Sequence, residues 1–251
     1  MIRFGSVCAF LLLFAYGPPA WAQDACTPSS EQVSQRDGAR LRLNVRCVDT
    51  ADAAEDAYPS FAIEYAAPGS DRFRHMLALD RDDFGEPIRA VSFVDIDGDG
   101  MHEVEARGMC GAGPNCLGDL YRWSEARGEL VHFFSGGYSD LRYLDGHLVE
   151  SGRASCCSWE YHAWRMDAAT ASLRDAPMDW MITVGAGAGA GAMDEGNDEA
   201  RCTFSRRSGD NWRVAAPPGP QWLSLCEVYG DTYHLVTPEE AQAADAAAQE
   251  Q

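Results

Sequence analysis

Apolar and aromatic residues between residues 39 and 236 come in short alternating runs, separated by turns rich in Gly, Asp and Ser. Alternation with a period of two residues is typical of β-strands, and no stretch of about 12 residues here keeps the period of an amphipathic helix. The clearest hairpin is residues 143–148, because Asp145-Gly146 suits a type I′ turn. The pattern therefore predicts an all-β domain. Its expected strands are residues 40–48, 60–65, 73–79, 88–94, 120–123, 130–134, 141–144 and 159–166.

A weak internal repeat indicates how these strands are grouped. Three units each join an aromatic residue and an arginine to a polar turn and a second apolar run. Their arginines, Arg122, Arg165 and Arg206, lie 43 and 41 residues apart. Propeller blades repeat about every 40–45 residues, although a β-meander would produce similar units by chance. We expect a β-propeller-like domain of about four or five blades.

The two ends of the chain differ from this domain. Residues 1–22 combine Arg3, a short apolar run and an Ala20-Trp21-Ala22 cleavage site, which is the pattern of a signal peptide. The apolar run is shorter than the roughly 20 residues that span a bilayer, and no lipid-attachment cysteine follows the cleavage site. We expect a soluble exported protein, periplasmic or secreted, with a single domain over residues 23–237. Residues 238–251 are acidic and Ala-rich and predict a frayed helix or a disordered tail, and residues 185–191 predict a flexible Gly-Ala loop.

Eight cysteines remain after the signal peptide, and an even number favours disulfides in an exported chain. Cys110 and Cys116 are separated only by turn residues, so they can pair locally. A bond between Cys26 and Cys47 would tie the N-terminal segment to the first strand. A zinc site is the alternative, but the sequence contains no C-x2-C pair.

The adjacent residues Cys156 and Cys157 are a separate question. We expect them to bond two different partners, for which Cys202 and Cys226 are the remaining candidates. The sequence alone leaves the connectivity open.

Charge and motif content exclude several functions. The chain has 20 basic and 39 acidic residues, a net charge of −19, and every basic residue is Arg. The absence of lysine excludes a P-loop lysine, a pyridoxal Schiff base and a lysine general base. The negative charge argues against nucleic acid as a partner and favours basic proteins or calcium. The motifs G-x-S-x-G, H-E-x-x-H and S-x-x-K are missing as well, so we expect no enzyme.

Residues 93–104 (FVDIDGDGMHEV) contain the most informative motif. Asp95, Asp97 and Asp99 stand at alternate loop positions, Met101 would offer its backbone carbonyl, and Glu103 adds a fourth carboxylate. Hard oxygen ligands of this number suit Ca²⁺, here with a structural role. An EF-hand would need a glutamate at its last loop position and flanking helices, whereas these flanks are strand-like. The loop instead resembles those of FG-GAP and VCBS-type calcium β-propellers; the alternative is an Asp-rich turn without metal.

A second motif, SGGYSD at residues 135–140, lies between two apolar runs. Its glycines and its Ser and Asp side chains favour a hairpin loop, which explains every residue except Tyr138. We expect Tyr138 at an exposed loop tip, where an aromatic side chain offers a rigid contact to a partner.

This segment resembles the S-G-x-Y loops of periplasmic lysozyme inhibitors, which enter the enzyme's active-site cleft. With the signal peptide, the D-I-D-G-D-G loop and C-C-S-x-x-Y-x-x-W at residues 156–164, the chain resembles propeller-like, calcium-binding immunity proteins. Those proteins neutralise lysozyme-like effectors of bacterial-killing type IV secretion systems. The resemblance covers residues 88–166, and several such relatives carry a lipid-attachment cysteine that this chain lacks. It implies that Ser135, Gly136 and Tyr138 form the inhibitory loop and that the four carboxylates named above hold the ion.

Two functional hypotheses follow. The first is an inhibitor of a lysozyme-like peptidoglycan glycosidase. Such enzymes use paired carboxylates in a cleft, to which Tyr and Ser hydroxyls can donate, and an acidic inhibitor associates faster with a basic enzyme. The second is a calcium-stabilised binding module of the FG-GAP type for a glycan or a protein, without inhibitory activity.

Overall fold

The computed structural model describes residues 26–48, 58–81, 85–167, 170–185 and 199–249. Over these residues the chain is mostly antiparallel β-sheet, as the alternating pattern predicted. The expected signal peptide and residues 186–191 of the Gly-Ala loop lie outside the described residues. No helix in the described ranges has the length and apolar character needed to cross a membrane.

The first sheet has the order β1-β2-β3-β4. Val33 of β1 lies opposite Leu41 of β2, and Leu43 lies opposite Ile63 of β3. These apolar residues alternate with charged ones, so one face of the sheet is buried and the other is solvated. The strands are β1 (Ser29–Ser34), β2 (Arg40–Val48), β3 (Tyr58–Ala66) and β4 (Arg74–Leu79).

The second sheet has the order β5-β6-β7-β8 and carries both motifs that the sequence singled out. The aspartate motif forms the turn between its first two strands, and residues 135–138 are the end of its last strand. The strands are β5 (Ala90–Val94), β6 (Glu103–Cys110), β7 (Cys116–Ser124) and β8 (Glu129–Tyr138).

The third sheet is larger and has the order β14-β13-β12-β11-β10-β9, with β15 parallel to β13. Its β9–β10 turn confirms the predicted type I′ hairpin, because Asp145 and Gly146 both have positive φ angles, 48° and 77°. The elements are β9 (Asp140–Leu144), β10 (His147–Ser155), β11 (Ser158–Arg165), β12 (Trp180–Gly185), β13 (Ala200–Ser208), β14 (Asn211–Val214), the 3-10 helix η2 (Pro220–Tyr229) and β15 (Tyr233–Leu235).

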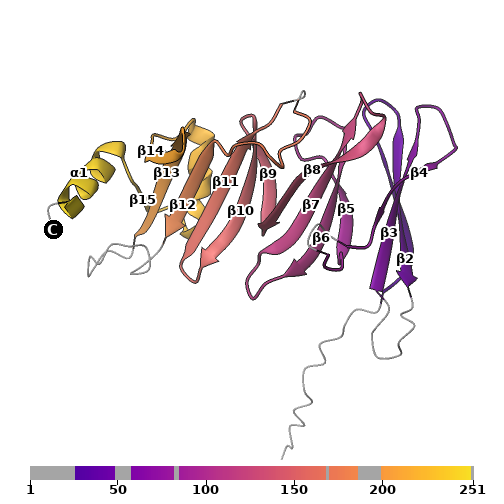
Figure 1. The fold of residues 1–251 in the computed structure, drawn as a ribbon, viewed down its shortest axis with the longest axis horizontal. Coiled ribbons are helices and arrows are strands. Elements are labelled where there is room, and N and C mark those ends of the chain that lie inside the picture. The colour runs from indigo at the N-terminus through magenta and orange to yellow at the C-terminus, as the bar shows by residue number, and fades with distance from the viewer. Residues whose placement is uncertain (1–25, 49–57, 82–84, 168–169, 186–198, 250–251) are drawn as a thin grey trace, which may run out of the picture.

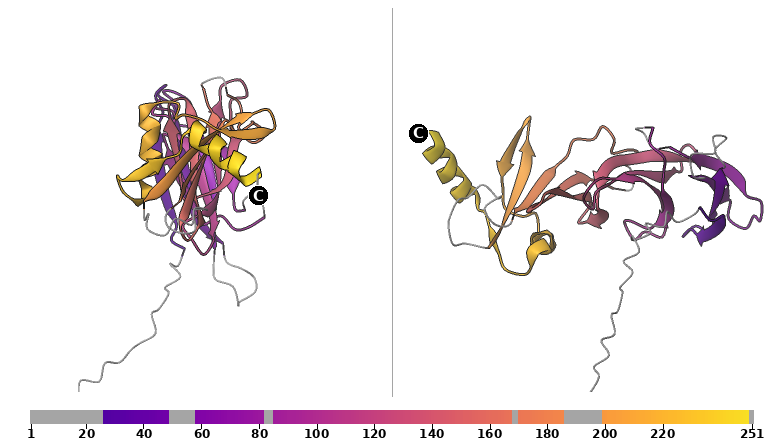
Figure 2. Two further views of the ribbon diagram at one scale, coloured as in Figure 1. Left: turned by 90° about the vertical axis from the view of Figure 1, so that its left-hand side faces the viewer. Right: turned by 90° about the horizontal axis from the view of Figure 1, so that it is seen from below.

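The three sheets follow one another along the long axis of the molecule (Figure 1). The first sheet lies at one end and the third at the other, and the view from below in Figure 2 shows the same row. One hydrophobic cluster joins the first two sheets, a second joins the second and third, and a third lies between the last sheet and η2. The described residues thus form three sheets without closing into a ring, and the four or five propeller blades are not confirmed.

The internal repeat also has a different structural basis from the one expected. Arg122 and Arg206 do precede hairpins, β7–β8 and β13–β14. Arg165 instead ends β11, and its next strand in the chain starts only at Trp180. The three repeat units therefore do not share one local structure.

Three disulfides lie within the described residues: Cys26–Cys47, Cys110–Cys116 and Cys202–Cys226. The first two agree with the sequence analysis. The third corrects it, because Cys202 of β13 bonds Cys226 of η2. It leaves Cys156 and Cys157 free of the two partners expected for them.

The C-terminal segment forms helix α1 (Pro238–Gln249). Thr237 begins it with a capping box: its hydroxyl oxygen accepts from the Glu240 amide at 3.3 Å, and Glu240 Oε2 accepts from the Thr237 amide at 2.8 Å. Proline at the first helical position fits this start.

Candidate functional site

The aspartate loop is a tight turn closed by its own carboxylates. Asp97 Oδ1 accepts from the Asp99 amide at 3.2 Å, and Asp99 Oδ1 accepts from the Met101 amide at 2.7 Å. Gly98 and Gly100 have φ angles of 71° and 80°, which side-chain-bearing residues rarely adopt. This backbone path brings the carboxylates at 95, 97 and 99 together.

Ligand oxygens of Asp95, Asp97 and Asp99 all lie within 4.8 Å of one another. Asp95 is exposed and the other two are half-buried. Three negative charges this close repel one another, and an oxygen-binding cation between them would remove the repulsion. The geometry therefore fits the ion that the spacing predicts.

Glu103, the fourth predicted carboxylate, is directed into the protein. Its Oε2 accepts a hydrogen bond from the Ile96 amide at 3.2 Å, and its side chain is 1% exposed. Burial raises the pKa of Glu103 to about 7, against the lowering effects of that hydrogen bond and of the Arg122 charge. Oε1 accepts no hydrogen bond from the described residues and faces Arg122 Nε at 3.3 Å. A role of Glu103 or of the Met101 carbonyl in holding an ion stays a prediction.

Arg122, from β7, joins the loop to the sheet. Its Nη2 donates to Asp97 Oδ2 at 2.6 Å while its Nε faces Glu103, and its side chain is 14% exposed. The guanidinium also lies 5.5 Å from the centre of the Phe133 ring. One half-buried cation therefore holds two of the acidic groups, which leaves fewer charges for an ion to balance.

Residues before β2 hold the other side of the loop. The Gln35 side chain is buried; its Oε1 accepts from the His102 amide at 2.6 Å and its Nε2 donates to the His102 carbonyl at 3.1 Å. The Arg36 amide donates to the Gly100 carbonyl at 2.7 Å. The loop is therefore the joint between the first and second sheets, and an ion there would act on both.

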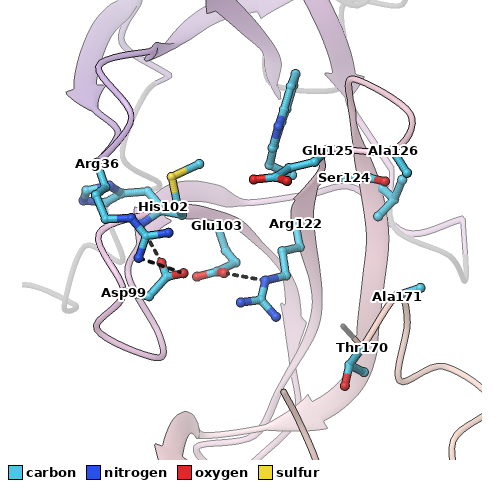
Figure 3. Close-up of a pocket in the computed structure, with 13 residues that line it drawn as sticks. Arg36, Asp99, His102, Glu103, Arg122, Ser124, Glu125, Ala126, Thr170 and Ala171 are labelled. Atoms are coloured by element: carbon cyan, nitrogen blue, oxygen red, sulfur yellow. Dashed lines mark hydrogen bonds and ion pairs between the residues drawn. The ribbon is translucent and has the colours of Figure 1, made fainter. Parts of the chain in front are cut away.

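Beside this loop is a pocket of about 380 Å³ (Figure 3). In Figure 3, Asp99 with Arg36 and Glu103 with Arg122 lie on one side, and Thr170 lies across from them. Charged groups thus line one side of a solvent-accessible hollow, and none of them is a nucleophile paired with a base.

The second motif does not form the protruding loop that the sequence predicted. Ser135, Gly136, Gly137 and Tyr138 belong to β8 and pair with β7. Tyr138 is 0% exposed, and its hydroxyl donates to Glu105 Oε1 at 3.0 Å. Burial raises the pKa of Tyr138. The prediction of an exposed tyrosine at a loop tip is therefore wrong.

Two glycines on the same sheet make room for neighbouring side chains, and one of them makes room for this ring. Gly118 of β7 lies under it: a Cβ there would meet the Tyr138 Oη and lie 2.6 Å from its Cζ. A Cβ on Gly136 would meet Glu150 Oε1 at 2.5 Å and Phe134 at 3.0 Å. Arg107 lies 4.7 Å from the centre of the Tyr138 ring on the sheet. Gly118 and Gly136 therefore make close packing possible, which a residue with a side chain would prevent.

Ser135 takes part in a polar cluster with Asp119 and His132. Its hydroxyl donates to Asp119 Oδ1 at 2.6 Å, and His132 Nε2 lies 3.1 Å from the same oxygen. An activated serine needs its proton directed to a base such as histidine. Here the Ser135 hydroxyl donates to the Asp119 carboxylate and not to the histidine, so the arrangement is structural.

No protein-family model matches the sequence, and no curated protein matches it. One solved structure that resembles this one is that of a Xanthomonas type IV secretion system related protein. The two chains are 13% identical with a TM-score of 0.44, and the match covers 76% of this chain and 98% of the other.

Sequence reasoning missed Gln35 and Arg122 as parts of the loop. Arg122 could be seen only as a repeat marker, because its contacts with Asp97 and Glu103 depend on the pairing of β6 with β7. Gln35 contacts His102 across 67 positions of sequence, and no local pattern reports such a contact.

Proposed function

We propose that this chain is an exported, non-catalytic binding protein whose first two sheets are held together by a calcium ion in the 95–103 loop. The observation that carries the proposal is the approach of the Asp95, Asp97 and Asp99 oxygens to within 4.8 Å, in a loop that Gln35 joins to the neighbouring sheet. Three disulfides support export, because such bonds persist in oxidising compartments.

The chain's own residues would hold the ion from several directions. The three aspartates supply carboxylate oxygens, and the Met101 carbonyl and Glu103 would complete the set. A bound calcium supplies positive charge that offsets the repulsion among the carboxylates. The Arg122 guanidinium already balances part of the Asp97 charge.

Calcium titration tests this proposal. Added Ca²⁺ should raise the thermal midpoint of the parent protein. At a Ca²⁺ concentration about 100 times the dissociation constant, the gain in the free energy of unfolding is about 2.7 kcal/mol. Asp97→Asn should lose most of that gain. Asp210→Asn, in the exposed turn between β13 and β14, is the matched control and should keep it. A parent protein indifferent to Ca²⁺, or an Asp97→Asn variant that responds like the parent, would contradict the calcium site.

Inhibition of a lysozyme-like glycosidase is the second candidate, in a changed form. The buried Tyr138 excludes insertion of its ring into an enzyme. Ser135, Gly136 and Gly137 nevertheless line an open hollow of about 750 Å³ together with Arg174 and Asp175. We infer that a basic partner would cover this hollow, drawn by the chain's net charge of −19.

Two glycines provide a matched test of that surface. A Cβ added at Gly137 would meet nothing within 4 Å, and the same holds for Gly113 in the Cys110–Cys116 loop. Gly137→Trp should abolish inhibition of lysozyme while Gly113→Trp leaves it unchanged. Equal inhibition by both variants would exclude this surface. If the parent inhibits no lysozyme, the inhibitor candidate is wrong and the calcium-stabilised module stands alone.

A further inference from the structure

The turn between β10 and β11 places two thiols side by side. Cys156 and Cys157 are its two central residues, flanked by the paired residues Ser155 and Ser158. The two Sγ atoms lie 2.6 Å apart, Cys156 is exposed and Cys157 is half-buried. A disulfide of about 2.05 Å requires only a small further approach.

The other mature cysteines are already used. Six of the eight form the three disulfides described above. Among the described residues, Cys156 and Cys157 therefore have no other free cysteine to bond than each other. Two free thiols at an exposed turn are unusual for a chain that carries disulfides elsewhere. We propose that Cys156 and Cys157 form a disulfide with each other, and that this turn is a redox modification site.

The local structure holds the turn in place for this bond. The Cys157 amide donates to Ser155 Oγ at 3.2 Å, and the Arg153 guanidinium donates to the carbonyls of Ser155 and Cys156 at 3.0 and 2.6 Å. Asn115 in turn fixes Arg153, accepting from its amide at 2.8 Å and donating to its carbonyl at 3.1 Å. These contacts restrict the turn before any covalent bond forms.

Turn chemistry offers no other reason for two cysteines here. Two-residue hairpin turns prefer positive φ angles and residues such as Asn and Gly. The β9–β10 turn of the same sheet follows this rule with Asp145 and Gly146. Cys156 and Cys157 do not, since Asp145 is the one non-glycine residue with a positive φ in the described ranges. A bond between the sulfur atoms would stabilise a turn that the backbone alone does not favour.

The bond would form by exchange with a small disulfide such as oxidised glutathione. The Cys156 thiolate, the more exposed, attacks one sulfur of that disulfide, breaks its S–S bond and expels one thiol. The hydrogen bond with Cys156 raises the pKa of the Cys157 thiol in the reduced state. Once ionised, Cys157 attacks Cys156 Sγ and expels the second thiol. The protein loses two hydrogens and the small disulfide gains them.

Peptide mapping tests the bond directly. Cleavage after arginine releases residues 154–165 (ASCCSWEYHAWR), which contain both cysteines and no other. Protein exported into an oxidising compartment and alkylated without reductant should yield this peptide unalkylated, uncrosslinked and lighter by two hydrogens. Alkylation at both cysteines, or a bond from either to another peptide, would overturn the proposal.

A second measurement separates exchange from an accidental oxidation. After mild reduction, oxidised glutathione should restore the unalkylated peptide, whereas Cys156→Ser and Cys157→Ser should each retain one glutathione on the remaining thiol. Retention of glutathione on both cysteines of the parent would show that they do not close on each other. Neither outcome depends on the calcium loop, so this proposal and the proposed function fail separately.

Discussion

Replacing Tyr138 with alanine distinguishes the buried residue seen in the structure from the exposed tip expected of an inhibitory loop. The side chain is 0% exposed and its ring lies on Gly118. Removal of such an aromatic leaves a cavity between the second and third sheets, and comparable Phe or Trp replacements cost about 3–5 kcal/mol. We therefore expect Tyr138→Ala to lower the free energy of unfolding by about 4 kcal/mol.

Phenylalanine at the same position isolates the hydroxyl. It keeps the ring and removes the hydrogen bond to Glu105, which remains paired with Arg107 at 3.2 Å. Because a hydrogen bond to a charged group contributes about 1.5–3 kcal/mol, and Glu105 keeps a partner, Tyr138→Phe should cost about 1.5 kcal/mol. Comparing the losses of unfolding free energy in the two variants separates the contribution of the packed ring from that of the hydroxyl hydrogen bond.

Urea denaturation followed by circular dichroism measures both losses. Tyr143 is the matched control, because this tyrosine lies on β9, the next strand in the chain, and is 38% exposed. Tyr143→Ala should change the unfolding free energy by about 0.5 kcal/mol or less. A Tyr138→Ala variant as stable as the Tyr143→Ala control would refute the buried position and restore the protruding loop.

Three further substitutions have expected outcomes in the same denaturation assay. The hydrogen bond with Glu150 raises the pKa of His162. Protonated His162 therefore stabilises the folded state fully below about pH 6.5, and this stabilisation is lost as pH rises through the folded pKa. His162→Gln should reduce this fall in the free energy of unfolding, and an unchanged pH profile would contradict the role of His162. Gly118→Ala should cost about 1–3 kcal/mol through contact with the tyrosine ring, whereas Gly137→Ala should be neutral. Arg122→Met should cost about 3 kcal/mol, because it leaves two carboxylates facing each other, and parent-like stability would exclude that role.

Local patterns in the sequence predicted the local structure well. Strand β2 has the predicted bounds, 40–48, because its alternation of apolar and polar residues is unbroken. The hairpin at Asp145-Gly146 and the Cys110–Cys116 bond were also predictable, since both depend on neighbours in sequence. The arrangement of the sheets was not, because residues far apart in the sequence, such as Leu41 and Leu130 of one cluster, decide which sheet faces are covered.

Cysteine pairing shows the same limit. Cys202 and Cys226 are joined because η2 packs on the sheet that contains β13, a contact between elements that sequence spacing does not reveal. The sequence predicted two different partners for Cys156 and Cys157. The hairpin turn instead holds their two sulfur atoms 2.6 Å apart.

The position of Tyr138 was within reach of the sequence. Phe134, Gly136 and Tyr138 occupy alternate positions, so a continued strand puts all three on one face, and the structure buries both aromatics. The Gly-Gly pair was interpreted as a turn because glycine relaxes the backbone. Glycine also vacates space on a sheet, and a large ring can fill it: Phe134 lies against Gly136, and Tyr138 lies over Gly118 of the neighbouring strand.

The aspartate loop was found because its ligands are local, yet its effect on the fold is not. Gln35 and Arg36 bond its backbone from the first sheet, and Arg122 bonds it from within the second. Any cation that fixes the loop must then favour the packing of the first sheet on the second. Loss of the cation must weaken the contacts of Gln35, Arg36 and Arg122 with the loop, although none of these residues is a ligand. A short acidic motif can in this way control the packing of two sheets, because the turn that carries it is the point where they meet.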